Sequence, residues 1–193
     1  MALGDCGPSL EELFELLYDI TPGGCHAEIV GGVVQMVPKR HSHWDVIRNV
    51  LFQLGNRFGP DSRLMVDVRL DLPGYGNMFC PDICKVSDGA DSAGEGNWRY
   101  QDVEFVLEVI SRATAGSDYG PKKAAYAAGG IPVYVIADPF TGLCHAHTMP
   151  KDGVYRSRMS VDFGDPIDLT DTVLGMMLMT DGFPRDGDGF HGG

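Results

Sequence analysis

The sequence predicts an α/β fold with a central mixed β-sheet flanked by helices, preceded by an N-terminal helix and a β-hairpin. Two apolar runs, Val103–Ile110 and Pro132–Ala137, have the length and continuity of strands that are covered on both faces. A helical pattern over Asp118–Gly129 separates them, and such a crossover normally joins parallel strands in a right-handed sense. The pair Gly31-Gly32, between two short apolar segments, predicts the hairpin.

Local signals define the elements of the first sixty residues. Ser9 and Glu12 have the spacing of a capping box, which begins a helix. A second, longer helix follows from apolar residues at helical spacing, and Gly59 and Pro60 end it. The expected elements are a helix over Ser9–Asp19, strands over Ala27–Val30 and Val33–Val37, and a helix from Ser42 to about Phe58.

Alternating apolar residues from Leu64 to Leu70 predict a half-buried strand in the middle of the chain. The polar, glycine-rich segment Ser87–Tyr100 is typical of a mobile surface loop. We expect a single domain over residues 1–185 and a disordered tail over residues 186–193. The remaining expected elements are a turn over Leu72–Met78, strands over Asp82–Val86, Leu143–Thr148 and Val154–Met159, and a closing segment over Ile167–Met179.

Composition narrows the classes of function. The net charge is −12, with 27 acidic against 15 Lys and Arg residues, which argues against a broad nucleic-acid-binding surface. No apolar run reaches the roughly 18 residues of a membrane span, and the N-terminus lacks the order of a signal peptide. Five irregularly spaced cysteines do not resemble a disulfide framework. We therefore expect reduced thiols, a cytoplasmic location and no membrane partner.

Three residues are candidates for a functional site. Glu108 lies inside an apolar strand, where a carboxylate is costly unless it is paired or binds a metal. Asp82 follows Pro81 at the start of another strand, and Lys122 lies where the crossover helix is expected to begin. Two carboxylates can hold a hard cation, while a lysine can orient water and stabilise phosphate charge. The alternatives are a strand-end glutamate paired with a lysine or a helix terminus, and an aspartate that only favours a turn.

The chain resembles the putative restriction endonuclease family of uncharacterised bacterial proteins, within the PD-(D/E)XK nuclease superfamily. The resemblance covers roughly Leu10 to Leu178, in the order and approximate spacing of that family. The segments and residues that carry it are Glu28–Val34, His43, Pro81-Asp82, Leu107–Ser111, Asp118, Lys122, Tyr126, Gly130–Tyr134 and Asp138-Pro139.

This resemblance implies a restriction-endonuclease-like fold and a metal-dependent nuclease. Asp82 and Glu108 would bind Mg²⁺ or Mn²⁺ as metal ligands, and Lys122 would be the third catalytic residue. The usual superfamily lysine lies two residues after the second acid, where this chain has Ile110; Lys122 matches a variant in which the lysine has moved to the following helix. Lys123 is the adjacent alternative. Two additional candidates are Glu28, from the first hairpin, and His43, as a substrate contact.

The implied partner is nucleic acid, DNA in the first instance, and a homodimer would supply the two sites needed to cut a duplex. A basic group at the hairpin–helix junction could contact the substrate, or it could simply be a solvated helix start. It consists of Lys39, Arg40, His41, His43 and Arg48. The second interpretation of the whole chain is a nuclease fold that has lost turnover and acts as a nucleic-acid or protein binding or regulatory module.

Two further patterns compete with the nuclease site. His145 and His147, with Cys144 nearby, would share a strand face and could bind a transition metal, although surface histidines are the more common case. Cys80 and Cys84 flank Asp82 without the spacing of a zinc knuckle, so we expect buried thiols. No nucleotide-binding P-loop motif occurs in the sequence.

Overall fold

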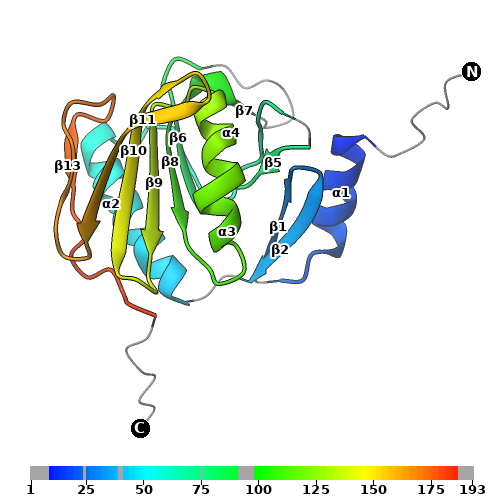
Figure 1. The fold of residues 1–193 in the computed structure, drawn as a ribbon, viewed down its shortest axis with the longest axis horizontal. Coiled ribbons are helices and arrows are strands. Elements are labelled where there is room, and N and C mark those ends of the chain that lie inside the picture. The colour runs from blue at the N-terminus through cyan, green and yellow to red at the C-terminus, as the bar shows by residue number, and fades with distance from the viewer. Residues whose placement is uncertain (1–8, 24, 39–40, 75, 91–97, 187–193) are drawn as a thin grey trace, which may run out of the picture.

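A computed structural model describes residues 9–23, 25–38, 41–74, 76–90 and 98–186 (Figure 1). Its larger sheet has the strand order β11-β10-β9-β8-β6-β3. The strands β8 and β9 are parallel and all other neighbours are antiparallel, which confirms the predicted mixed sheet. The bounds are β3 (Leu64–Met65), β6 (Ile83–Val86), β8 (Val103–Val109), β9 (Val133–Asp138), β10 (Leu143–Lys151) and β11 (Val154–Asp162).

The helical crossover between β8 and β9 has three parts: α3 (Ala115–Ser117), a π-helical segment η2 (Asp118–Lys122) and α4 (Lys123–Ala128). It begins three residues earlier than the sequence predicted. Pro121 lies inside the π turn, and because proline has no backbone N–H it cannot make the α-helical bond at that position. The crossover covers one face of the large sheet (Figure 1).

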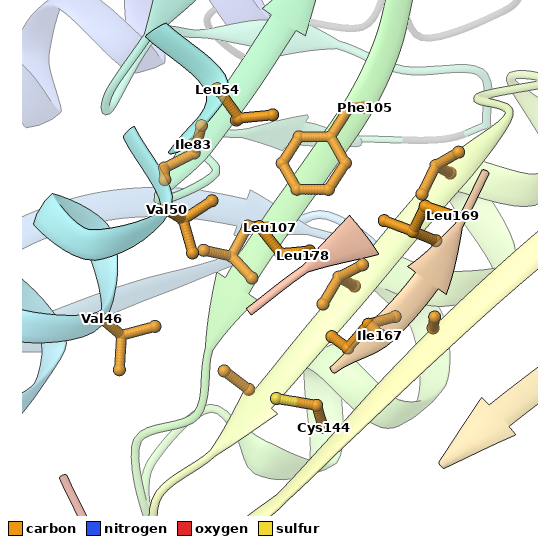
Figure 2. Close-up of a cluster of buried hydrophobic side chains, with 14 of the residues drawn as sticks. Val46, Val50, Leu54, Ile83, Phe105, Leu107, Cys144, Ile167, Leu169 and Leu178 are labelled. Atoms are coloured by element: carbon orange, nitrogen blue, oxygen red, sulfur yellow. The ribbon is translucent and has the colours of Figure 1, made fainter. Parts of the chain in front are cut away.

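The opposite face of the large sheet is covered by α2 (His41–Phe58) and by a small hairpin of β12 (Ile167–Leu169) and β13 (Met176–Leu178). Val50 and Leu54 of α2 pack against side chains of β6 and β8 in this core (Figure 2). Gly59 adopts a φ of +88° and its amide bonds to the carbonyl of Gly55, which ends α2 where the sequence predicted.

A second sheet of five strands has the order β2-β1-β5-β4-β7. Its hairpin turns at Gly31 and Gly32, both with positive φ, which confirms that prediction. The helix α1 (Leu10–Ile20) packs beside the hairpin, and the capping box between Ser9 and Glu12 is present. The strands are β1 (Cys25–Val30), β2 (Val33–Pro38), β4 (Leu70–Asp71), β5 (Met78–Phe79) and β7 (Trp98–Arg99), and the short 3-10 helix η1 spans Tyr100–Asp102.

Two predictions about the middle of the chain are wrong. The expected strand from Leu64 to Leu70 is broken, because Asp67 takes a left-handed φ of +57°, and its two ends join different sheets. The expected loop Ser87–Tyr100 contains β7, which pairs in parallel with β4; residues 91–97 of that loop lie outside the described residues. The turn over Leu72–Met78 ends in β5.

The ends of the described chain bear on two other expectations. The amide of Asp186, the first residue of the expected tail, donates a 2.9 Å hydrogen bond to the carbonyl of Pro139. Residues 187–193, the rest of that tail, lie outside the described residues. None of the helices among the described residues has the length and apolar character of a membrane-spanning segment.

Candidate active site

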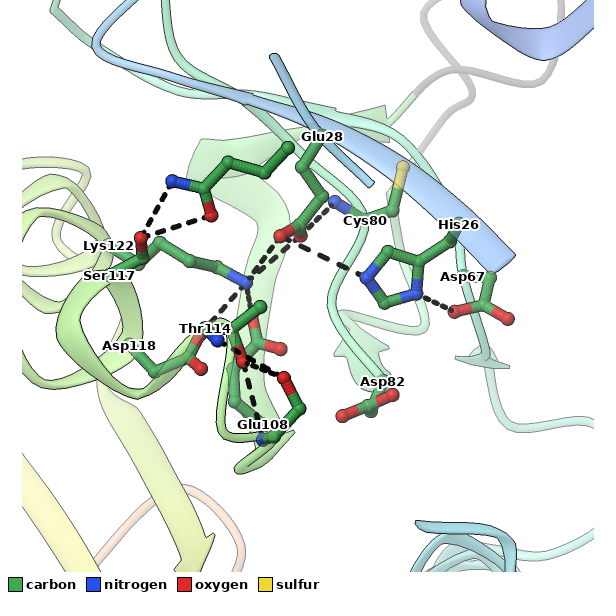
Figure 3. Close-up of polar contacts among 12 residues, drawn as sticks. His26, Glu28, Asp67, Cys80, Asp82, Glu108, Thr114, Ser117, Asp118 and Lys122 are labelled. Atoms are coloured by element: carbon green, nitrogen blue, oxygen red, sulfur yellow. Dashed lines mark hydrogen bonds and ion pairs between the residues drawn. The ribbon is translucent and has the colours of Figure 1, made fainter. Parts of the chain in front are cut away.

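The amine of Lys122 is the centre of a buried group of ion pairs. Its Nζ lies 2.9 Å from Oε1 of Glu28, 2.6 Å from Oε1 of Glu108 and 3.1 Å from Oδ1 of Asp118. Glu28 belongs to β1, Glu108 to β8 and Asp118 to η2, so three separate elements meet at one cation (Figure 3). We call Glu28, Glu108, Asp118 and Lys122 the Lys122 cluster.

Asp82 lies beside the Lys122 cluster, immediately before β6. The antiparallel pairing of Ile83 with Leu107, carried one residue further, places Asp82 opposite Glu108. Opposite residues of an antiparallel pair project from the same face of a sheet, here the face that α4 covers. Oδ2 of Asp82 accepts a 2.8 Å hydrogen bond from the backbone amide of Val109. The structure thus brings the three predicted residues, Asp82, Glu108 and Lys122, into one region.

Neighbouring groups orient the acids of the cluster. The hydroxyl of Tyr126 donates a 2.6 Å hydrogen bond to Oε1 of Glu108, and the amide of Cys80 donates one of 2.9 Å to Oε1 of Glu28. The hydroxyl of Tyr134 bonds to the backbone carbonyl of Asp118 at 3.0 Å and so fixes the π turn. The carboxylates of Glu28 and Glu108 are therefore each held by a hydrogen bond from another part of the chain, whereas Tyr134 holds the backbone of Asp118.

A second contact, in addition to the ion pair of Lys122, joins the hairpin to the crossover. The amide nitrogen of Gln35, on β2, donates to the hydroxyl of Ser117 at 2.8 Å, and that hydroxyl donates back to the amide oxygen at 3.1 Å. Together with the pair of Glu28 and Lys122, this contact joins the small sheet to the helix above the large sheet (Figure 3). The position of Glu28 therefore depends on how the two sheets dock.

Burial is the largest single influence on the pKa values of Glu108 and Lys122. Glu28 is 0%, Lys122 1% and Glu108 3% exposed. Burial raises the pKa of Glu108 well above its usual range; the charge of Lys122 opposes this, while Asp118, Glu28 and Asp82 add to it. Burial alone would lower the pKa of Lys122, but Glu108, Glu28 and Asp118 outweigh it and hold that pKa well above its usual value. Lys122 is therefore a cation.

The structure adds two residues that the sequence did not single out. His26 lies two residues before Glu28 on β1 and shares its face, and its Nδ1 is 3.6 Å from Oδ1 of Asp67. Their ligand atoms and one of Asp82 all lie within 4.8 Å of one another. Because side chains two residues apart in a strand share a face, the position of Glu28 in the predicted hairpin could have indicated His26. No pattern indicated Asp67, because its placement depends on the left-handed break.

The other candidates occupy different positions. His43 is buried in the first turn of α2, and its contact with substrate stays a prediction. Lys123 is half-buried at the start of α4, and its charge contributes to lowering the pKa of His145 and His147. His41 and Arg48 are exposed on α2, and Arg48 lies 3.4 Å from Asp45. Lys39 and Arg40 lie outside the described residues.

Among the residues that the structure describes, His145, His147 and Cys144 do not form the metal site considered for β10. His145 and His147 are buried under the crossover rather than on the surface, so that expectation was wrong. Cys144 belongs to the core on the opposite face of the sheet and cannot join them. Cys80 and Cys84 are buried free thiols as predicted, and burial raises the pKa of Cys84 to about 12.

The sequence of the chain matches a protein-family model, Uma2, described as "Putative restriction endonuclease", over residues 10–180. The chain belongs to the Uma2 family. The similarity recognised in the sequence is thereby confirmed. No curated protein matches the chain. Among solved structures, a putative nuclease belonging to DUF820 from Anabaena variabilis ATCC 29413 superposes with a TM-score of 0.64 and 11% identity, over 84% of this chain and 89% of that one. This similarity supports the restriction-endonuclease-like fold.

The residues of this Uma2 protein fit a divalent cation. The carboxylates of Asp82 and Glu108 supply the hard oxygen donors that Mg²⁺ and Mn²⁺ prefer. Among the charges that act on Glu108, three are carboxylates and one is the amine of Lys122, so negative charge is in excess at this point. A cation bound between Asp82 and Glu108 would offset that excess.

Proposed function

We propose that this chain is a metal-dependent endonuclease that hydrolyses phosphodiester bonds of nucleic acid, with DNA as substrate and Mg²⁺ or Mn²⁺ as the cofactor. One observation carries the proposal: Lys122 contacts Glu108 at 2.6 Å, and Asp82, immediately before β6, lies opposite Glu108 when the register of β6 and β8 is extended by one residue. Two acids and a lysine at one point of a sheet face provide the groups that phosphodiester hydrolysis requires. Membership of the Uma2 family supports the same conclusion.

Each residue has a defined task in this proposal. Asp82 and Glu108 would hold the cation, which would supply Lewis acidity and lower the pKa of bound water. Lys122, kept charged by the surrounding carboxylates, orients the attacking water and stabilises negative charge on the phosphate. Tyr126 holds the carboxylate of Glu108 in place through its 2.6 Å hydrogen bond. Glu28 positions the amine of Lys122.

The direct test measures cleavage of duplex and single-stranded DNA and RNA with Mg²⁺, Mn²⁺ or a chelator. We expect cleavage that requires the cation and falls at least about 100-fold in Asp82→Asn and Glu108→Gln. Glu104→Gln is the matched control, because Glu104 lies on the same strand but pairs with Lys85 at 2.7 Å. Cleavage that survives both site substitutions would overturn the assignment. A homodimer, if the enzyme cuts duplexes, would appear in the sedimentation of the protein with DNA.

The burial of the site favours a second candidate, a nuclease fold that binds nucleic acid or protein without turnover. Glu28, Glu108 and Lys122 are at most 3% exposed, and a substrate phosphate must reach the cation between them. The two candidates differ in a binding experiment with a chelator present. A module without turnover binds nucleic acid and leaves it intact under every metal condition, whereas the proposed enzyme cleaves it once the cation is added.

A further inference from the structure

His26, Asp67 and Asp82 form a convergent set of ligand atoms next to the proposed catalytic pair. One ligand atom from each lies within 4.8 Å of the other two. The ring of His26 lies between two acids, with Nδ1 3.6 Å from Oδ1 of Asp67 and Nε2 4.0 Å from Oε2 of Glu28 (Figure 3). Nδ1 of His26 is buried and makes no hydrogen bond within the part of the chain that the structure describes. A nitrogen in this position is available as a ligand.

The backbone holds these residues together independently of any cation. The extended geometry of β1 places the side chain of His26 on the same face of the strand as that of Glu28. The amide of Asp67 donates a 3.1 Å hydrogen bond to the carbonyl of Pro81, which directly precedes Asp82. Asp67 also has a φ of +57°, a backbone conformation that is strained for a residue with a side chain and that clusters at functional sites.

A route from solvent leads to this position. A cavity of about 420 Å³ is lined by His26, Asp67 and Cys80, with Leu17 and Thr21 on the side of α1. The side chain of Asp67 is 38% and that of His26 13% exposed, whereas the side chains of Lys122 and Glu108 are at most 4% exposed. A hydrated ion can therefore meet His26 and Asp67 before it meets the Lys122 cluster.

The geometry points to a second cation site made of His26, Asp67 and Asp82, which takes a first-row transition metal of the Mn²⁺ class in preference to Mg²⁺. An imidazole nitrogen with two carboxylates suits Mn²⁺, Fe²⁺ or Zn²⁺, whereas Mg²⁺ favours oxygen ligands alone. Asp82 belongs to both positions, so its carboxylate would be a ligand in each. The contribution of the second cation to hydrolysis rests on the proposed function; its binding does not.

The test titrates the metal-free full-length protein with Mn²⁺ and follows the loss of the free-ion EPR signal. We expect His26→Leu and Asp67→Asn each to weaken one Mn²⁺ site at least about tenfold, and the bound Mn²⁺ to lose a nitrogen coupling in His26→Leu. Mg²⁺ affinity should change less than twofold in His26→Leu. Two controls should bind like the wild type: His41→Leu, at an exposed histidine, and Asp152→Asn, at an exposed aspartate with a φ of +51°.

The outcomes separate this site from the proposed function. Unchanged Mn²⁺ affinity and no nitrogen coupling in the wild type would overturn the site, even if the protein cleaves DNA through Asp82 and Glu108. Binding that depends on His26 and Asp67, in a protein that never cleaves nucleic acid, supports the site and contradicts the nuclease proposal. If His26→Leu does not fold, Asp67→Asn decides, because its partly exposed side chain is replaced by one of equal size.

Discussion

The amine of Lys122 lies 2.6 Å from Oε1 of Glu108, and the two side chains are only 1% and 4% exposed. A buried pair that loses one partner leaves the other charge without compensation, which destabilises a protein more than the intact pair stabilises it. At Lys122 this effect is multiplied, because Glu28 and Asp118 depend on the same amine. The lysine therefore has a structural as well as a proposed catalytic task.

Lys122→Met keeps the length of the side chain and removes its charge. We expect it to lower the free energy of unfolding by about 3–5 kcal/mol, measured by urea denaturation with a chelator present. Lys151→Met is the control, because Lys151 is exposed at the end of β10. Added Mn²⁺ should restore part of the lost stability, since it offsets the same carboxylates. A variant as stable as the wild type would contradict the role of the lysine in the cluster.

Tyr126→Phe removes only the hydroxyl that donates to Glu108. We expect cleavage to fall about tenfold while Mn²⁺ affinity changes less than threefold, because Glu108 keeps its carboxyl group but loses the hydrogen bond that orients it. Tyr155→Phe is a comparable control: its hydroxyl bonds to the carbonyl of Ile131, outside the cluster. Equal losses of activity in both variants would indicate a general packing effect.

Gly76 holds the turn of the β1–β2 hairpin in place. A Cβ at this position would lie 2.6 Å from the backbone nitrogen of Gly32, and the φ of Gly76 is +61°. We expect Gly76→Ala to cost about 2–4 kcal/mol, from backbone strain plus displacement of the turn. In the control Gly153→Ala, φ is +73° and the space is open, so only about 1 kcal/mol is expected. Thermal denaturation of both variants measures the difference.

His147 makes the fold sensitive to acid. Burial, with smaller contributions from Lys123 and Arg158, lowers its pKa to about 4. The unfolded chain therefore binds a proton at this histidine more readily than the folded chain between about pH 6.5 and 4, so its contribution to stability decreases as the pH falls through that range. We expect His147→Gln to flatten the dependence of the unfolding midpoint on pH between 6.5 and 4. An unchanged slope would show that other groups control it.

Local chemistry determines several parts of the fold, and these could be predicted from the sequence. The two continuous apolar runs became β8 and β9 in parallel, and Gly31-Gly32 became the hairpin turn. The capping box at Ser9 formed as its spacing indicated. These features depend on neighbours in the chain, so a single sequence is enough to predict them.

Features that depend on distant contacts were missed. The break at Asp67 follows from a bond to the carbonyl of Pro81, and β7 exists because it pairs with β4. The same limit applies to the site. Glu108 was conspicuous as a charge in an apolar strand, whereas His26 and Asp67 have ordinary surroundings in the sequence and meet Asp82 only when the two sheets dock.

The π turn at Asp118–Lys122 determines how far α4 is rotated about the helix axis relative to α3. An i→i+5 turn contains one residue more than an α-helical turn, and each residue of an α-helix advances the side chain by about 100°. Deleting Gly120 would shorten this turn by one residue and rotate one flank by about that angle. Either Lys122 would leave Glu108, or Ser117 would leave Gln35. The alignment of two sheets with one helix thus depends on a single inserted residue.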